Sequence, residues 1–305
     1  MTDLSRRVLL ITAAGGLAAA AGCGPGARPV PTSTGQPAVS PGSEPRTPTP
    51  SATAASPRPS VTPRPRPRSS PASDVQIAAR ATVPVLCWHQ LRNWTSSDDS
   101  YARTLLICPP ATFRAQLDAL AEGGWTTIGP DQYLAHLTAG ATLPAKPVLL
   151  SFDDSQGSQI TEGLPQLQAR KMTATFFAMT VVLDKPGWFS RRDLRRLDDA
   201  GMTVAAHTWD HHRVDQYTGR DWSLQLKKPR ELLEKILGKP VDHFAYPYGA
   251  WNAAALPHVE AAGYRSAYQL ADKTPSTSAP RYTLRRELVA STWSGRQLVR
   301  QLQSP

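Results

Sequence analysis

Short apolar runs alternate with amphipathic segments along the chain from about residue 83 to residue 268. The apolar runs have the length and composition of buried parallel strands. They predict strands over residues 83–89, 126–128, 147–154, 173–179, 202–207, 244–248 and 264–268. The intervening segments carry apolar residues at helical spacing and predict helices over residues 112–123, 130–139, 164–170, 190–200, 221–237 and 252–262.

The repeated strand–helix order indicates parallel pairing with right-handed crossovers. About seven such units predict an α/β fold, a distorted (β/α) barrel with about seven parallel strands, rather than an open sheet. We assign the folded domain to residues 79–305, a length that is ample for a substantial core.

The first residues have the pattern of an export signal. Arg6 and Arg7 precede an apolar run over residues 8–21, which is short for a membrane span and ends in small residues. The sequence that follows resembles a bacterial lipobox, in which Cys23 is lipidated. We therefore expect residues 1–23 to direct export and to anchor the protein to the outer face of the cell membrane. Ordinary cleavage near Ala21, which would release a secreted protein, is the alternative.

Residues 24–78 read as a disordered linker because they are rich in Pro, Ser, Thr, Ala and Gly and cannot bury apolar surface. Part of the formal charge of +10 lies in this tail, so the folded part is only mildly basic. This argues against nucleic acid as a partner.

Acidic and imidazole side chains follow two of the predicted strands. Asp153 and Asp154 end one apolar run, and His207 ends another, with His211 four residues further on. Because parallel strands end at the same mouth of a barrel, these side chains are expected to meet there. One carboxylate and two imidazoles from this set make a three-ligand metal site with an open position, the hydrolytic type. The remaining carboxylate can accept a proton.

These segments are similar to motifs of the polysaccharide deacetylase family (the NodB-homology domain, carbohydrate esterase family 4). The matching motifs are Ser-Phe-Asp-Asp at 151–154, His-Thr-Trp-Asp-His at 207–211 and Tyr-Pro-Tyr-Gly at 246–249. The resemblance implies a distorted barrel that removes acetyl groups from a sugar polymer with the help of a metal. It also implies a role for each residue, with Asp153 as the base, Asp154, His207 and His211 as metal ligands, and the backbone N–H of Tyr248 stabilising the oxyanion. Zinc is the family's usual metal, and cobalt, nickel and manganese also suit these ligands.

The chain departs from the family pattern at two points. Ala245 stands where the family has an arginine that orients the base, and Arg285 or Arg286 is a possible substitute. The family's last motif, with its catalytic histidine, has no match, so we take His89 as the candidate general acid. These features resemble the branch that acts on poly-β-1,6-N-acetylglucosamine.

The sequence leaves two questions open, the second histidine ligand and the state of two cysteines. His212 is an alternative to His211 as ligand, because some relatives space the histidines one residue wider. Cys87 and Cys108 are either bridged or free. The aromatic side chains assigned to a sugar-stacking platform are Trp88, Tyr246 and Trp209.

We expect a monomeric hydrolase that removes N-acetyl groups from a cell-surface polysaccharide containing N-acetylglucosamine and releases acetate. Its partners would be the acetylated glycan and, through the lipid, the membrane. The alternatives are an O-acetyl esterase or deacetylase on another glycan, such as xylan or chitin, and a catalytically weak wall-binding lipoprotein. The wall-binding lipoprotein is considered because the family's arginine and its last catalytic histidine are missing from the motifs.

Overall fold

The computed structural model describes residues 71–270 and 274–303. The predicted export signal with Cys23, and the predicted linker up to residue 70, lie outside these described residues. Within the described part of the chain, no helix is both long enough and apolar enough to span a bilayer.

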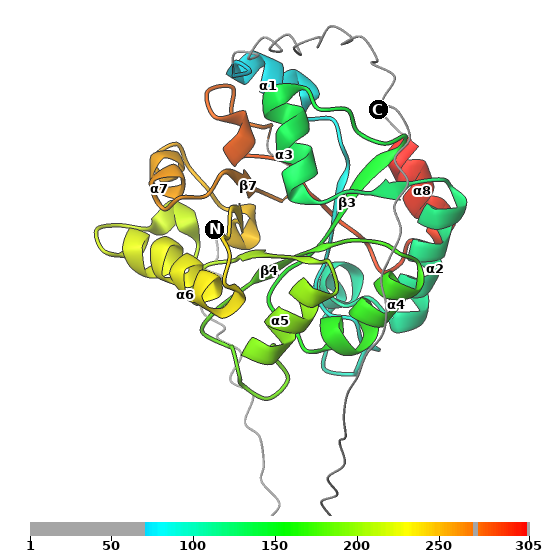
Figure 1. The fold of residues 1–305 in the computed structure, drawn as a ribbon. Coiled ribbons are helices and arrows are strands. Elements are labelled where there is room, and N and C mark those ends of the chain that lie inside the picture. Colours follow the sequence, from blue (N-terminus) through cyan, green and yellow to red (C-terminus); the bar gives the residue numbers. More distant parts are fainter. Residues whose placement is uncertain (1–70, 271–273, 304–305) are drawn as a thin grey trace, which may run out of the picture. The chain divides into compact units, whose positions relative to one another are not determined.

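The described strands form one parallel sheet that curls around a central core (Figure 1). Seven strands follow one another in the order β7-β6-β5-β4-β3-β1-β8, and β2 pairs beside β3. The strands are β1 (Val85–Trp88), β2 (Thr126–Thr127), β3 (Pro147–Phe152), β4 (Thr175–Ala178), β5 (Thr203–Ala206), β6 (His243–Ala245), β7 (Ser266–Tyr268) and β8 (Glu287–Leu288). The predicted fold class, a distorted barrel with about seven parallel strands, is confirmed.

Residues 284–288 close the gap between the two edges of the sheet. Leu284 pairs with β7, where its N–H donates to the Ala267 carbonyl at 3.0 Å. A few residues later β8 pairs with β1, with Cys87 opposite Leu288. This segment is therefore the seam of the barrel, and Arg286 lies within it.

Side chains alternate between the barrel interior and the surrounding helices, as they must along extended strands. An inner cluster contains Val85, Leu149, Phe177, Ala245 and Tyr268 from five different strands. The side chains next to these in sequence, such as Leu86 and Leu150, belong instead to the larger cluster beneath the helices. This alternation decides which residues can reach the mouth of the barrel.

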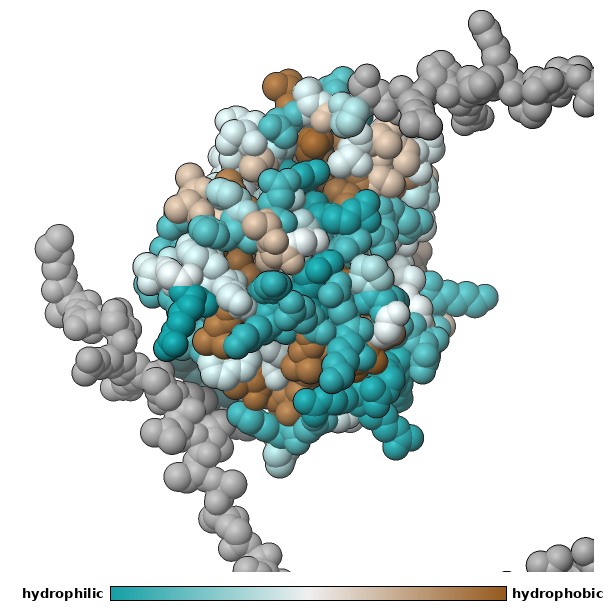
Figure 2. All heavy atoms as spheres, turned by 60° about the vertical axis from the view of Figure 1, so that its left-hand side comes forward, coloured by the Kyte–Doolittle hydropathy of each residue, from teal (hydrophilic) through white to brown (hydrophobic). Residues whose placement is uncertain are grey.

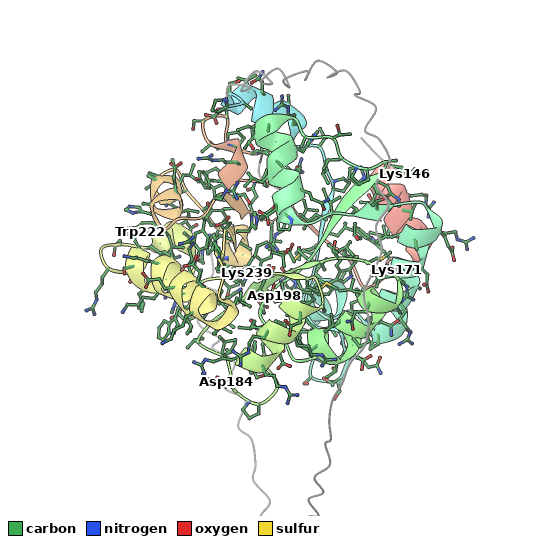
Figure 3. All side chains as sticks on the ribbon, viewed as in Figure 1. Lys146, Lys171, Asp184, Asp198, Trp222 and Lys239 are labelled. Atoms are coloured by element: carbon green, nitrogen blue, oxygen red, sulfur yellow. The ribbon has the colours of Figure 1, made fainter. Side chains whose placement is uncertain are left out.

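Most of the amphipathic segments form helices that pack on the outside of the sheet (Figure 1), whereas Ile77, Tyr133 and Leu137, from the first and third of the α-helices, belong to the inner cluster. The described α-helices are α1 (Asp74–Arg80), α2 (Pro110–Glu122), α3 (Pro130–Ala139), α4 (Leu164–Ala169), α5 (Arg191–Asp199), α6 (Lys228–Leu237), α7 (Ala255–Ala261) and α8 (Gly295–Gln303). Charged pairs join neighbouring elements at the surface, as between Asp198 of α5 and Lys239 just after α6 (Figure 3). Hydrophilic side chains cover most of the face in Figure 2, and hydrophobic ones appear there in separate groups.

Helix α1 begins inside residues 24–78, the predicted linker, and continues to Arg80. Ser73 caps it in a reciprocal capping box with Gln76, which satisfies the helix's first N–H groups. Ile77 is buried in the inner cluster, and Arg80 donates to the Leu137 carbonyl of α3 at 3.0 Å. The folded part therefore begins by residue 73.

Candidate active site

The inward positions at the ends of β1, β3 and β5 carry polar side chains. Counting inward residues in steps of two leads from Val85 to His89, from Leu149 to Asp153 and from Ala205 to His207. All three polar residues are buried, and they gather around Asp153. The His207 Nε2 atom lies 3.8 Å from Asp153 Oδ2, and the His89 Nε2 atom lies 4.0 Å from the same oxygen.

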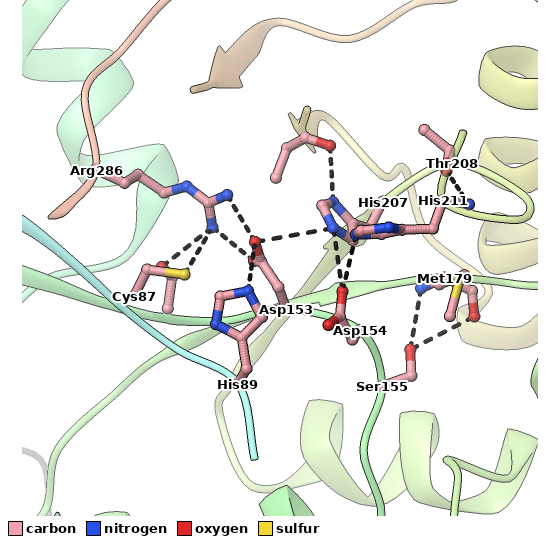
Figure 4. Close-up of polar contacts among 12 residues, drawn as sticks. Cys87, His89, Asp153, Asp154, Ser155, Met179, His207, Thr208, His211 and Arg286 are labelled. Atoms are coloured by element: carbon pink, nitrogen blue, oxygen red, sulfur yellow. Dashed lines mark hydrogen bonds and ion pairs between the residues drawn. The ribbon is translucent and has the colours of Figure 1, made fainter. Parts of the chain in front are cut away.

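Arg286 holds Asp153 through two parallel hydrogen bonds (Figure 4). Its Nη1 donates to Asp153 Oδ1 at 2.6 Å and its Nη2 donates to Oδ2 at 2.7 Å. The guanidinium itself is buried, lies over the Phe177 ring at 4.9 Å and donates from Nε to the Gln269 carbonyl. Burial alone would raise the pKa of Asp153, but the charge of Arg286 lowers it below its usual value. Of the two arginines considered from the sequence, Arg286 is therefore the one that orients this carboxylate.

Asp154 reaches the same mouth because the chain leaves its extended conformation after β3. Its φ is 75°, a left-handed conformation that turns its side chain toward the histidines. Asp154 Oδ1 lies 3.4 Å from His207 Nε2 and 3.2 Å from His211 Nε2. The three predicted metal ligands thus come together at one point.

Left-handed backbone is concentrated around this cluster. Besides Asp154, it occurs at Ser155, Thr208, His211 and Tyr248. Each such residue costs free energy, of the order of 1–3 kcal/mol for sparsely populated conformations, and these costs are typical of functional sites. Gly249 follows at φ 63°, and a Cβ there would lie 2.5 Å from the backbone nitrogen of Leu270.

The cluster of Asp154, His207 and His211 fits a divalent cation. Its ligand atoms all lie within 4.8 Å of one another, and Asp154 Oδ1 is buried without a hydrogen-bond partner. The Nδ1 atom of His207 is engaged with the Ala245 carbonyl at 2.8 Å, which leaves Nε2 facing Asp154. Burial would raise the pKa of Asp154, but the two histidines lower it well below its usual value. Oxygen and imidazole ligands of this kind suit zinc and its neighbours in the periodic table.

His211, rather than His212, occupies the cluster. The side chain of His212 is 73% exposed, and its Nδ1 pairs with Asp210 Oδ1 at 2.7 Å. His211 instead turns inward, where its ring packs edge-on against the ring of Tyr248 at 4.5 Å.

His89 lies below Asp153 in Figure 4, on the side away from Asp154. It is only 6% exposed, and its Nδ1 has no hydrogen-bond partner. Its backbone carbonyl accepts a hydrogen bond from Gln159 Nε2 at 2.7 Å, and the same nitrogen also donates to the Asp153 carbonyl. Gln159, which the sequence did not single out, thus joins the ends of β1 and β3. Burial lowers the pKa of His89.

The predicted sugar-stacking platform is wrong for two of its three members. Trp88 and Tyr246 point outward from their strands and are buried beneath the helices, where no glycan can reach them. Trp88 donates from Nε1 to Gln116, and the Tyr246 hydroxyl donates to the Tyr282 carbonyl. Trp209 is 37% exposed and Tyr248 is 61% exposed, so these two aromatic residues remain accessible.

Cys87 and Cys108 are both free and buried in the structure. Cys108 contacts Gln116 on the helix side, whereas Cys87 faces the barrel interior beside Arg286. The two thiols therefore lie on different sides of the sheet.

Together the fold and the site define a class: an α/β barrel with a hydrolytic type of metal-ligand cluster and a neighbouring carboxylate at its mouth. Residues 140–267 match the family model described as Polysaccharide deacetylase, so the resemblance to that family found in the sequence is confirmed over this part of the chain.

Known proteins resemble the chain at low identity. YxkH of Bacillus subtilis, whose name places it among polysaccharide deacetylases, is 23% identical over 215 residues, which is 70% of this chain and 74% of that protein. A poly-beta-1,6-N-acetyl-D-glucosamine N-deacetylase of Staphylococcus aureus is 24% identical, and the match covers 48% of this chain and only 56% of the relative. The solved structure of the Streptococcus pyogenes deacetylase PplD in complex with acetate shares the fold, with a TM-score of 0.67 and 22% identity. It covers 73% of this chain and 98% of that one.

Proposed function

We propose that this protein is a metal-dependent hydrolase that removes N-acetyl groups from a cell-surface polysaccharide containing N-acetylglucosamine, with release of acetate. The observation that carries the proposal is the pairing of two neighbouring carboxylates with different partners. Asp154 Oδ1 faces the Nε2 atoms of His207 and His211 at 3.4 Å and 3.2 Å, while Asp153 is held by Arg286. Such a division of environments is typical of sites in which one carboxylate binds and the other moves a proton.

A divalent cation held by Asp154, His207 and His211 would supply Lewis acidity toward the acetamide carbonyl and toward water. Asp153 is the proton acceptor for the attacking water, because its lowered pKa keeps it ionised at neutral pH. Asp153 Oδ2 lies 3.8 Å from His207 Nε2 and 4.0 Å from His89 Nε2. His89 Nε2 lies on that side and is the candidate donor of a proton to the leaving amine. The backbone N–H of Tyr248 is the candidate oxyanion donor.

The substrate class rests on the exposed rim and on the relatives. Tyr248 offers an accessible aromatic face against His211, and Trp209, two residues before His211 in the chain, is also exposed. The Staphylococcus aureus relative is named for a β-1,6-linked N-acetylglucosamine polymer. Export and lipid anchoring through Cys23 belong to this proposal and rest on the sequence alone.

One of the two grounds for a catalytically weak wall-binding lipoprotein was the missing arginine. That ground no longer holds, because Arg286 supplies the guanidinium that Ala245 lacks. A deacetylase or esterase acting on another glycan remains the alternative. The identity of the glycan separates it from the proposal.

The test is an acetate-release panel. Acetylated oligomers of β-1,6- and β-1,4-linked glucosamine, peptidoglycan and acetylated xylan are incubated with the protein, with and without a chelator. We expect release from an N-acetylglucosamine polymer, loss of release with chelator and recovery when zinc or cobalt is restored. Asp153→Asn should keep the metal and lose turnover by about 10²–10⁴-fold. Bound metal without acetate release from any of these glycans would contradict the proposal.

A further inference from the structure

A second group of potential metal ligands lies beside the first. Cys87, His89 and Asp153 bring a sulfur, a nitrogen and a carboxylate oxygen within 4.8 Å of one another, and all three side chains are buried. We call these three residues the thiol cluster. Thiolate and imidazole ligands attract zinc, and this set is softer than that of Asp154, His207 and His211.

The thiol cluster also contains an unsatisfied atom. His89 is 6% exposed and its Nδ1 makes no hydrogen bond. Figure 4 shows Cys87, His89 and Arg286 on one side of Asp153, and Asp154 with His207 and His211 on the other. A cation in the thiol cluster would therefore bind the carboxylate that the proposed reaction needs uncoordinated.

Arg286 is placed to prevent this. Its Nη1 lies 2.6 Å from Asp153 Oδ1 and 3.5 Å from Cys87 Sγ, and its Nη2 occupies the other carboxylate oxygen. A fixed guanidinium between two of the three ligand atoms repels a cation and uses the lone pairs that would bind it. Phe177 and the Gln269 carbonyl hold the guanidinium in this position.

We propose that Arg286 keeps the thiol cluster free of metal, so that the barrel takes up one cation rather than two and Asp153 stays available as a base. Arg286 is in this sense a positioning residue with a second role, that of excluding thiophilic divalent cations. The inference rests on the proposed function for the first cation only.

The test uses Co²⁺ as the probe, because thiolate coordination to cobalt gives a near-ultraviolet charge-transfer band that oxygen and imidazole ligands do not give. The full chain carries Cys23→Ser throughout, so that only the two buried thiols remain. The wild-type barrel should bind about one Co²⁺ without the thiolate band. Arg286→Met, which removes the charge and keeps an apolar side chain, should bind about two and show the band.

Matched variants identify the thiol. In the Arg286→Met background, Cys87→Ser should abolish the band and the second equivalent. Cys108→Ser should leave both in place, because Cys108 faces the helices and contacts Gln116. A band that survives Cys87→Ser would overturn the assignment, as would an Arg286→Met protein that binds one Co²⁺ and shows no band.

A second neutral variant and the wild-type protein serve as controls in case Arg286→Met does not fold. Arg286→Gln should behave as Arg286→Met does, and circular dichroism shows which variants are folded. If neither folds, titration of the wild-type barrel with excess Co²⁺ still tests the proposal, because appearance of the thiolate band would overturn it. The band reports the thiol cluster alone, whereas failure of the proposed function would appear as loss of the first equivalent or of acetate release.

Discussion

Replacing Arg286 with glutamine should move the acid limb of activity to higher pH. In the folded protein two opposing effects set the pKa of Asp153: burial raises it and the guanidinium lowers it, with the guanidinium and the nearby histidines prevailing. Arg286→Gln removes the largest of the lowering effects and leaves the burial. Asp153 then binds a proton at higher pH, and the protonated carboxyl cannot act as a base.

The magnitude follows from the burial of the pair. An opposite charge in contact lowers a carboxyl pKa by about 1–3 units, so the acid limb should rise by a similar amount. Breaking a buried ion pair costs about 3–5 kcal/mol of stability, because one charge is left uncompensated. The pair stabilises the folded state fully above the ordinary carboxyl pKa, and this contribution is lost as pH falls through the lowered folded-state value. The stability difference between wild type and variant should therefore be largest near neutral pH and should shrink in acid.

The assay is the pH dependence of kcat/KM for acetate release at one equivalent of metal per chain, so that no second cation occupies Asp153. Metal content is measured at each pH, so that metal loss is separated from protonation of the base. Urea unfolding across the same range gives the stability difference. Arg285→Gln is the matched control, because its side chain is exposed while that of Arg286 is buried. An acid limb that stays at the wild-type pH in Arg286→Gln, with the protein folded and loaded, would refute the reasoning.

Three further outcomes are expected. His211→Ala should lose the cation and activity, measured by metal analysis and acetate release, whereas His212→Ala should keep both because its side chain is 73% exposed; equal losses would contradict the ligand assignment. Trp88→Ala should destabilise the protein by about 3–5 kcal/mol in urea unfolding, because the ring is buried. Trp209→Ala should leave stability within about 0.5 kcal/mol and raise KM, and a larger loss of stability in Trp209→Ala than in Trp88→Ala would contradict these assignments. Ile77→Ala should cost about 2–4 kcal/mol, which a residue in a passive linker would not.

The convergence of the site was predictable from the chain because it depends on one geometric rule. Asp153, Asp154 and His207 end apolar runs, and parallel strands bring their carboxyl ends to one mouth. The same period of two along β1 could have separated His89 from Trp88, since neighbours on a strand face opposite ways. Applied strictly, that rule would have removed Trp88 from the sugar platform.

Other features depend on register that no pattern reveals. Arg285 and Arg286 are neighbouring residues of the same type, so the sequence alone does not show which one points into the barrel. The pairing of β8 with β1 turns Arg286 inward. Helix α1 escaped notice because it is short and borders a Pro-rich stretch, although Ser73 and Gln76 carry the spacing of a capping box. Gln159 belongs to no recognisable motif. Its hydrogen bonds to the His89 and Asp153 carbonyls can form only once the ends of β1 and β3 lie side by side.

The seam at residues 284–288 couples completion of the fold to the chemistry. During synthesis β1 and β3 emerge well before this segment, so Asp153, the proposed proton acceptor, has no contact with Arg286 until the seam has been made. A chain halted or cut before the seam would carry every ligand for the cation and still lack a tuned base.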